Sequence, residues 1–551
     1  MRTDVLIVGA GPAGLLMANL LARAHVNFIL LDKKAGPIDE SRAILMHGRT
    51  LELLDKLDLA EPAIAAGQKM TGVHILIDGK QKVFLPLDAG GEQISPYGYS
   101  LVHEQSKTER LLLRGVKEFH AQIEWNTQLV SLTQAEQEAT AVIKRSDGSE
   151  ATITAAYVVG ADGASSTVRQ ALGVPFEGST YEHGFFLADV DMTWSRGTHR
   201  WYVNLTQHAF FGAFPYGGNH FRLIGTLKLR QETRQNLSLE ELREIVAREK
   251  GFEDITLLGA NWISIYHVHR KQAKQFRVGR CFLIGDAAHI HTPAGGQGMN
   301  TSLGDAYNLG WKLASVVKQQ AQASLLDSYE QERQPIALAV ENGTDKVFNL
   351  QITGNPILNR ARRTFVPLLV NSLQHLGFEN AIYRAIAQMW VAYRKSPVVS
   401  ECYEGNEGKR HNVQAGDRTP YGFLKEGAHT QISIFSLLKG VGHHVLLFEG
   451  MQEQGDVNLQ SIQEQIENLL KVYTFPVAIH LVSADNYTLQ KSYGARTPRL
   501  FLIRPDGYIA YSGQADDLES FRTYLNRIFT RQRDGDKQLL PDTLSQARLG
   551  G

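Results

Sequence analysis

The chain is poor in cysteine, in long apolar runs and in excess charge of either sign. Only two cysteines, Cys281 and Cys402, occur in 551 residues, which excludes a disulfide framework and a cysteine-based metal site and favours a reducing compartment. No stretch approaches the roughly 20 apolar residues of a membrane span. The 57 basic and 57 acidic residues cancel. These absences predict a cytoplasmic protein without a metal ion, a nucleic-acid partner or a membrane partner.

Glycine, in contrast, is frequent, and three separate glycine motifs occur in a fixed order. The first is Gly9–Gly14, the second is Gly160–Gly163, and the third is Gly285-Asp286 followed by the loop Gly295–Asn300. A single glycine motif is weak evidence. Three segments so far apart in the chain predict an extended dinucleotide that is held along its whole length, which favours FAD over NAD.

The first motif lies between two predicted strands. The apolar run Asp4–Val8 predicts a buried parallel strand, Leu15–Ala24 predicts a helix, and a second strand over Asn27–Leu31 ends at an acid. This order predicts a site for the adenosine and pyrophosphate, with the carboxylate on a ribose rather than near a 2′-phosphate. The alternative is a glycine-rich turn of any α/β protein. The predicted contact residues are Gly9, Gly11, Pro12, Ala13, Gly14, Asp32 and Lys33.

The third motif follows a predicted strand over Cys281–Ile284. Asp286 is expected to bind a polyol such as the ribityl chain, although it could instead cap the following helix. The glycines of Pro293–Gly298 would let the main chain lie flat against a ring system. A helix that begins near Met299 would stabilise negative charge on the reduced flavin.

These motifs and the segments between them resemble the class A flavoprotein monooxygenases, the aromatic hydroxylases related to para-hydroxybenzoate hydroxylase. The resemblance extends from residue 1 to about residue 390, and it includes Arg49–Leu54 and Leu326–Pro335. It implies that Arg42 and Gln105 reach the FAD pyrophosphate and ribityl chain, unless they are ordinary polar surface residues. The further contacts that it implies are Asp162 with both FAD and pyridine nucleotide, Asp286 with the ribityl chain, and Pro293, Gly298, Met299 and Asn300 around the flavin pyrimidine.

The resemblance also implies an activity. FAD would bind tightly but not covalently, and NADH or NADPH would bind transiently as co-substrate. Together with O₂ they would hydroxylate a phenolic or polycyclic aromatic substrate through a flavin C4a-hydroperoxide. Two alternatives are a non-oxygenating FAD-dependent oxidoreductase on the same fold and a catalytically silent flavin-binding scaffold.

No catalytic base can be assigned from the sequence. Phenol-type members of the family carry an aspartate between the positions that match Arg42 and Arg49, whereas this chain has no acid there. The candidates for a catalytic role are His47, Tyr202, Tyr216 and His267.

The expected fold class is α/β. A Rossmann-like FAD-binding domain (1–70, 101–180 and 271–345) is interrupted by an antiparallel-sheet substrate domain (71–100 and 181–270), because short aromatic-rich segments there alternate with period two. A helical connector (346–400) precedes residues 401–551, which resemble the thioredoxin-like C-terminal domain of phenol-hydroxylase-type members. This segment has no Cys-x-x-Cys motif, so its expected role is structural or a subunit contact in a monomer or homodimer.

Overall fold

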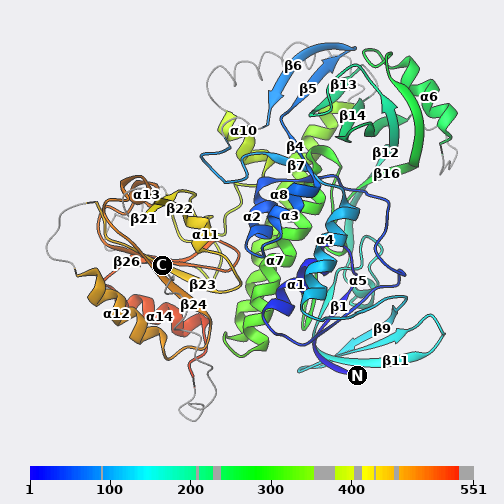
Figure 1. The fold of residues 1–551 in the computed structure, drawn as a ribbon. Helices are drawn as coiled ribbons and strands as arrows, with labels where there is room; N and C mark the ends of the chain where they lie inside the picture. The colour runs from blue at the N-terminus through cyan, green and yellow to red at the C-terminus, as the bar shows by residue number, and fades with distance from the viewer. Residues whose placement is uncertain are drawn as a thin grey trace.

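The computed structural model describes residues 1–87, 91–206, 210–227, 237–352, 379–402, 413–426, 430–451 and 458–532. Figure 1 shows a large body built on two sheets, with a smaller C-terminal body packed against one side of it. The helices α7 and α8 lie between the C-terminal body and the rest of the chain. Within the described ranges, no helix has both the length and the hydropathy needed to cross a membrane.

The first sheet is largely parallel and has the strand order β17-β18-β11-β1-β2-β8. Its central strand β1 is buried from Val5 to Ile7, as expected of an apolar run in the middle of a parallel sheet. Helix α1 packs on β1 and β2, helices α4 and α7 pack against α1, and the β9–β10 hairpin extends from β11. The bounds are β1 Arg2–Val8, α1 Pro12–Arg23, β2 Phe28–Leu31, α4 Gln105–Glu118, β8 Ile123–Glu124, β9 Gln128–Gln134, β10 Ala139–Lys144, β11 Glu150–Gly160, α5 Thr167–Ala171, β17 Arg277–Val278, β18 Cys281–Leu283 and α7 Gln297–Val317.

The second sheet is mostly antiparallel and has the order β19-β16-β12-β15-β14-β13-β5-β6. Side chains alternate between its two faces. One face carries Phe186, Phe211 and Phe221 beneath α6, and the other carries Asp189 and Arg222. The bounds are β5 Gly72–Ile77, β6 Lys80–Pro86, β12 Phe176–Thr193, β13 Arg200–Leu205, β14 Phe210–Gly217, β15 His220–Leu227, α6 Leu239–Arg248, β16 Thr256–Ala273 and β19 His289–Ile290.

A short three-stranded sheet, in the order β3-β7-β4, joins these two parts next to helices α2 and α3. Two long stretches of helix follow the third glycine motif. Residues 353–378, which are about half of the predicted connector (346–400), lie outside the described residues. The bounds are β3 Leu45–Met46, α2 Gly48–Asp55, α3 Ala60–Ala66, β4 Gln68–Met70, β7 Ser100–Val102, α8 Ser328–Ile352 and α10 Glu379–Ile386.

The C-terminal body contains a five-stranded sheet in the order β20-β26-β25-β23-β24. Strand β24 runs parallel to β23, whereas β25 is antiparallel to both of its neighbours. Helices α12 and α14 cover one face, and α11 and α13 cover the other. The bounds are β20 Ser400–Cys402, β21 Phe423–Glu426, β22 Thr430–Ser433, α11 Ile434–Leu437, β23 His443–Phe448, α12 Leu459–Leu470, β24 Val477–Val482, α13 Tyr487–Tyr493, β25 Arg499–Ile503, β26 Ile509–Gln514 and α14 Leu518–Ile528.

A buried network of charges holds the two bodies together. Arg504, next to the turn between β25 and β26, donates two hydrogen bonds of 2.7 and 2.9 Å to the Glu332 carboxylate on α8. Lys312 of α7 donates to the same carboxylate at 2.7 Å. Arg418 of the C-terminal body pairs with Glu52 of α2. All five side chains are almost fully buried, so the two bodies dock in one specific arrangement.

Candidate cofactor and active site

The first glycine motif is close-packed on one side and open on the other. A Cβ on Gly9 would lie 2.3 Å from the Ala161 carbonyl oxygen, and one on Gly14 would lie 1.9 Å from the Gly9 carbonyl oxygen. Both positions therefore require glycine. A Cβ on Gly11, in contrast, would meet nothing within 4 Å. The open side, at the N-terminus of α1, is where backbone N–H groups can reach a pyrophosphate.

Asp32 follows β2 and fixes the turn of this motif. Its Oδ2 accepts a hydrogen bond of 2.6 Å from the Ala10 N–H, and its Oδ1 accepts one of 2.8 Å from the Lys34 N–H. The carboxylate is thus oriented beside the motif, as a ribose-binding acid must be. Lys33, the residue beside it, has an exposed side chain.

In the second motif, Asp162 caps a helix with one carboxylate oxygen only. Its Oδ2 accepts from the N–H groups of Thr167 (2.7 Å) and Val168 (3.2 Å) at the start of α5. Its Oδ1 is buried and has no hydrogen-bond partner in the part of the chain that the structure describes. Burial raises the pKa of this carboxyl, against the hydrogen bonds that it accepts. An unpartnered buried oxygen of this kind needs a donor from a ligand or from water.

Asp286 of the third motif has an exposed side chain between the buried residues Gly285 and Ala287. Nearby protein atoms that displace water raise the pKa of its carboxyl, while His289 and Arg42 oppose the rise. The carboxylate is therefore accessible beside the buried third motif. Arg169 ties the neighbouring motifs together, because it donates to the carbonyls of Ala287 (2.9 Å) and Ala164 (2.7 Å).

Asp305 of α7 anchors the third motif, and the sequence analysis missed it. Its Oδ2 accepts from the Gly285 N–H (3.2 Å) and from Nε2 of His289 (2.6 Å), and its Oδ1 accepts from Nε of Arg333 (2.7 Å). The charge of Arg333 helps to lower the pKa of this carboxyl against its burial. An acid at helical spacing among the apolar residues Leu303, Ala306 and Leu309 was the signal that it has a buried partner.

The glycine loop, defined as Gly295–Gly298, leads into α7. Gly295 and Gly296 have φ of 73° and 63°, a left-handed conformation that favours glycine. A Cβ on Gly298 would meet nothing within 4 Å. Asn300 fixes the loop, since its Nδ2 donates to the carbonyls of Gly296 (2.7 Å) and Leu45 (2.9 Å). The N-terminus of α7 therefore borders open space.

His47 supports this loop from within the protein. Its ring is fully buried, with Nε2 at 3.0 Å from the Gly295 carbonyl oxygen and Nδ1 at 3.1 Å from Oγ of Ser100. A carbonyl can only accept, so Nε2 carries the proton and Nδ1 accepts from the hydroxyl. Burial lowers the pKa of His47 to about 4, against the hydrogen bond to Gly295. The ring is therefore uncharged at neutral pH, and both of its nitrogens are hydrogen-bonded.

The polar face of the second sheet lies against the segment that contains Arg42. Arg222 donates from Nε and from a terminal nitrogen to the Asp189 carboxylate, both at 2.7 Å, and from the other terminal nitrogen to the Arg42 carbonyl oxygen at 3.2 Å. Tyr216 donates its hydroxyl to Asp189 at 2.7 Å. The Tyr266 hydroxyl is buried and has no partner within the described ranges. In the sequence, Asp189 and Arg222 could have been found because each is a charged residue within a strand-like, largely apolar segment.

The other catalytic candidates lie elsewhere. Tyr202 belongs to the opposite face of the sheet, where its ring stacks on His74 at 4.8 Å and contacts Trp194 at 4.7 Å. His267 lies on β16, where it pairs with Gly184 of β12, and its side chain is not among those described. The structure thus brings Tyr216, but not Tyr202, to the face that borders the Arg42 segment.

Gln105 and Arg42 lie at a junction next to the first motif. The Gln105 N–H donates to the Ala43 carbonyl oxygen at 2.9 Å, and its side-chain Oε1 accepts from the Ala43 N–H at 3.2 Å. The Arg42 side chain is exposed. Open space at Gly11 and Gly298, the unpartnered oxygen of Asp162 and the accessible carboxylate of Asp286 fit an elongated dinucleotide.

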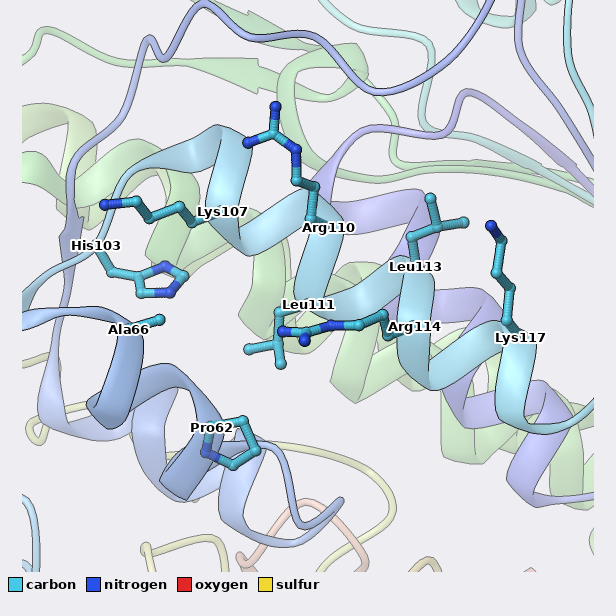
Figure 2. A pocket seen from close by; sticks show the side chains of 9 residues that line it. All are labelled: Pro62, Ala66, His103, Lys107, Arg110, Leu111, Leu113, Arg114 and Lys117. Carbon is cyan, nitrogen blue, oxygen red and sulfur yellow. The ribbon is translucent and has the colours of Figure 1, made fainter.

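A separate groove of about 500 Å³ lies between α3 and α4 (Figure 2). Its lining shares no residue with the motifs described above. Lys107 and Arg110 on its rim are already paired with Glu104 and Asp39. The glycine motifs, and not this groove, therefore define the candidate site. The lining residues are Pro62, Ala66, His103, Lys107, Arg110, Leu111, Leu113, Arg114 and Lys117.

Comparisons with known proteins identify the family to which the chain belongs. Residues 2–344 match the family model described as FAD binding domain. The chain is 32% identical over 540 residues to a flavin-dependent monooxygenase of Mycobacteroides abscessus, covering 95% of this chain and 99% of the relative. It is 34% identical to 6-methylpretetramide 4-monooxygenase of Streptomyces rimosus, covering 96% and 94% of the two chains.

Among solved structures, the OxyS anhydrotetracycline hydroxylase from Streptomyces rimosus superposes with a TM-score of 0.74 at 27% identity, covering 96% of this chain and 99% of that one. The chain belongs to the class A FAD-dependent aromatic hydroxylases, and its activity is that of an FAD-dependent monooxygenase.

Proposed function

We propose that the protein hydroxylates a polycyclic aromatic compound, using NADH or NADPH and O₂, between the glycine loop and the polar face of the second sheet. The observation that carries the proposal is the cluster of Asp189, Tyr216, Arg222 and Tyr266 on that face. It supplies hydrogen-bonding groups within an aromatic surface, as a site for an oxygenated ring system requires. Relatives named for 6-methylpretetramide and anhydrotetracycline support a substrate with several fused rings.

FAD would be held by residues of all three motifs. Bound FAD, reduced by a nicotinamide co-substrate that docks transiently, supplies the oxygen-activating chemistry. The N-terminus of α7 would stabilise negative charge on the reduced ring, and the sheet would exclude water. The residues assigned to FAD are Gly9, Gly11, Pro12, Ala13, Gly14, Asp32, Lys33, Arg42, Gln105, Asp162, Asp286, Pro293, Gly298, Met299 and Asn300.

The protein's own contribution to the reaction is mainly orientation. Burial raises the pKa of Tyr266, against the charge of Arg222, so its hydroxyl stays protonated and can donate to a substrate oxygen. Burial also raises the pKa of Tyr216, which remains a donor to Asp189. Neither tyrosine, nor the neutral His47, is assigned as a base, which suits a substrate that reacts without prior deprotonation by the enzyme.

We assign the C-terminal body to the thioredoxin-like class, with a structural role. The strand order β26-β25-β23-β24 and the order of strands and helices along the chain support this assignment. The buried ion pairs between this body and helices α2 and α8 support a role in holding the helices that border the cofactor. The proposal places the enzyme in the cytoplasm as a monomer or homodimer.

The test is NADH and NADPH oxidation by the purified holoprotein against a panel of phenols, phenolic acids and polycyclic aromatics, with product masses read under ¹⁸O₂. A polycyclic compound that accelerates oxidation and gains one labelled oxygen atom is the expected result. A preference for simple phenols would overturn the substrate class. Flavin reduction without oxygen in any product would indicate a non-oxygenating oxidoreductase, and bound FAD that no nicotinamide can reduce would indicate a silent scaffold.

A further inference from the structure

The glycine loop is held on its inner side by a residue of the connector, far away in the sequence. Gln297, at the start of α7, has a buried side chain. Its Nε2 donates to the Ile386 carbonyl oxygen at 2.9 Å, at the end of α10. Its Oε1 accepts from Nε2 of Gln388 at 2.7 Å. Two neutral amides thus join the loop to the connector.

Gln388 makes a second contact with the same helix. Its Nε2 donates to Oγ1 of Thr301 at 2.9 Å, and the Thr301 hydroxyl in turn donates to the Gln297 carbonyl oxygen at 2.9 Å. The side chain is almost fully buried. Both amide hydrogens of Gln388 are therefore used on the first turn of α7, which is the turn that borders the open space at Gly298.

The backbone of Gln388 is held in an unfavourable conformation. Its φ is 58°, in the left-handed region that residues with a side chain rarely adopt. A residue in this region persists only where the surrounding structure requires it, and such residues concentrate at functional sites. Glycine would fit this backbone better, but it would lack the amide that bonds Gln297 and Thr301.

The connector continues from Gln388 into the C-terminal body. The Tyr393 hydroxyl accepts from Arg333 at 3.0 Å, Ser396 donates to Glu332 at 2.6 Å, and the chain then forms β20, the edge strand beside β26. One continuous segment therefore contacts the glycine loop at one end and the C-terminal sheet at the other.

We propose that Gln388 is a positioning residue for the flavin, which sets the place of the glycine loop through Gln297 and Thr301 and so couples the connector to the affinity and reduction potential of FAD. The N-terminus of α7 can stabilise the reduced flavin only where its N–H groups are correctly placed. The proposal rests on FAD binding and on no particular substrate, so it can fail or hold independently of the hydroxylation reaction.

The experiment compares Gln388→Ala and Gln388→Gly in the holoprotein. Both lose the amide, but only glycine tolerates the left-handed backbone, so Gln388→Gly should unfold at a higher temperature than Gln388→Ala. If the amide positions the loop, both should release FAD more readily, with a dissociation constant raised about tenfold. Both should also show a more negative midpoint potential of the bound flavin.

Gln334→Ala is the matched control, because this glutamine of α8 also donates its amide to a carbonyl, that of Lys274 at 2.9 Å, and its hydrogen bonds join Lys274 and Gln272, not the loop. It should leave FAD release and potential at the values of the unchanged protein. The proposal is overturned if Gln388→Gly regains the original FAD affinity and potential together with its stability. It is also overturned if neither variant differs from Gln334→Ala in these two flavin measurements.

Discussion

The two ends of helix α7 are held in opposite ways. At its N-terminal end, Asn300, Gln297 and the neutral ring of His47 fix the glycine loop through amide, carbonyl and imidazole groups. In its C-terminal half, Lys312 lies in a buried cluster of charges with Glu332 and Arg504. Figure 1 shows this half beside the C-terminal body.

The difference separates two tasks of one helix. Neutral contacts hold the loop without adding formal charge at the proposed flavin site, where the helix N-terminus would act on the reduced ring. Buried ions are costly unless every partner is in place, so they tolerate only one docking arrangement. Trp311 reinforces this arrangement, because its Nε1 donates to the Asp506 carboxylate at 3.2 Å.

The largest effect is expected at the charged end. Arg504→Ala leaves the Glu332 and Asp506 carboxylates buried without their main partner, which should lower the free energy of unfolding by about 3–5 kcal/mol. Urea unfolding followed by tryptophan fluorescence measures this. Arg522→Ala, which removes an exposed pair with Glu519 in the same body, should cost less than about 1 kcal/mol. Equal losses of unfolding free energy in Arg504→Ala and Arg522→Ala would mean that the buried network does not determine how the two bodies dock.

A smaller effect is expected at the neutral end, and it depends on pH. The pKa of His47 is about 4 in the folded protein and 6.5 in the unfolded chain, so between these values the unfolded state binds more protons. The contribution of His47 should therefore lower the free energy of unfolding by roughly 3 kcal/mol as the pH falls from 6.5 to 4. The free energy of unfolding, measured at both pH values, should change less with pH in His47→Gln than in the unchanged protein. Parallel curves for the two proteins would contradict this.

The smallest change in stability is expected for a glycine pair within α7. Gly298→Ala adds a methyl group in open space, so it should stabilise the helix by about 0.5–1 kcal/mol while it weakens FAD binding. Gly310→Ala places its Cβ 2.6 Å from Cδ1 of Leu20, so it should destabilise by about 1–3 kcal/mol with FAD affinity unchanged. Thermal unfolding measures the stability of both variants, and FAD release measures their affinity for FAD. If FAD affinity changed in parallel with stability in both variants, the two parts of the helix would not have separate roles in FAD binding and in packing.

Local patterns predicted much of the fold. The strand, turn and helix of the first motif were expected from apolar runs and glycine spacing, and the structure confirms them as β1 and α1. The sequence of Leu459–Leu470 also predicts a helix, which the structure has as α12, and the Asp506-Gly507 pair predicts the hairpin turn that joins β25 and β26. Each of these depends on residues that are near one another in the sequence.

The remaining features depend on pairing between distant segments. Tyr202 and Tyr216 both lie on strands, and only the register of the sheet decides which face each occupies. Asp305 signals a buried partner but does not identify Arg333 or His289. Nothing in the sequence near Gln388 indicates its role, because that role depends on Gln297, which lies beside it only in the folded chain.

Trp311, with Ala321 and Leu325, belongs to the apolar core of the C-terminal body and packs with residues as late in the chain as Phe529. During synthesis, helix α7 leaves the ribosome long before the strands and helix that cover this side of it. Because synthesis adds about 5–20 residues per second, the indole of Trp311 would stay uncovered for on the order of 10–40 s. The nascent protein therefore passes through a stage with an exposed apolar surface, at which chaperones can bind and a stalled chain would aggregate.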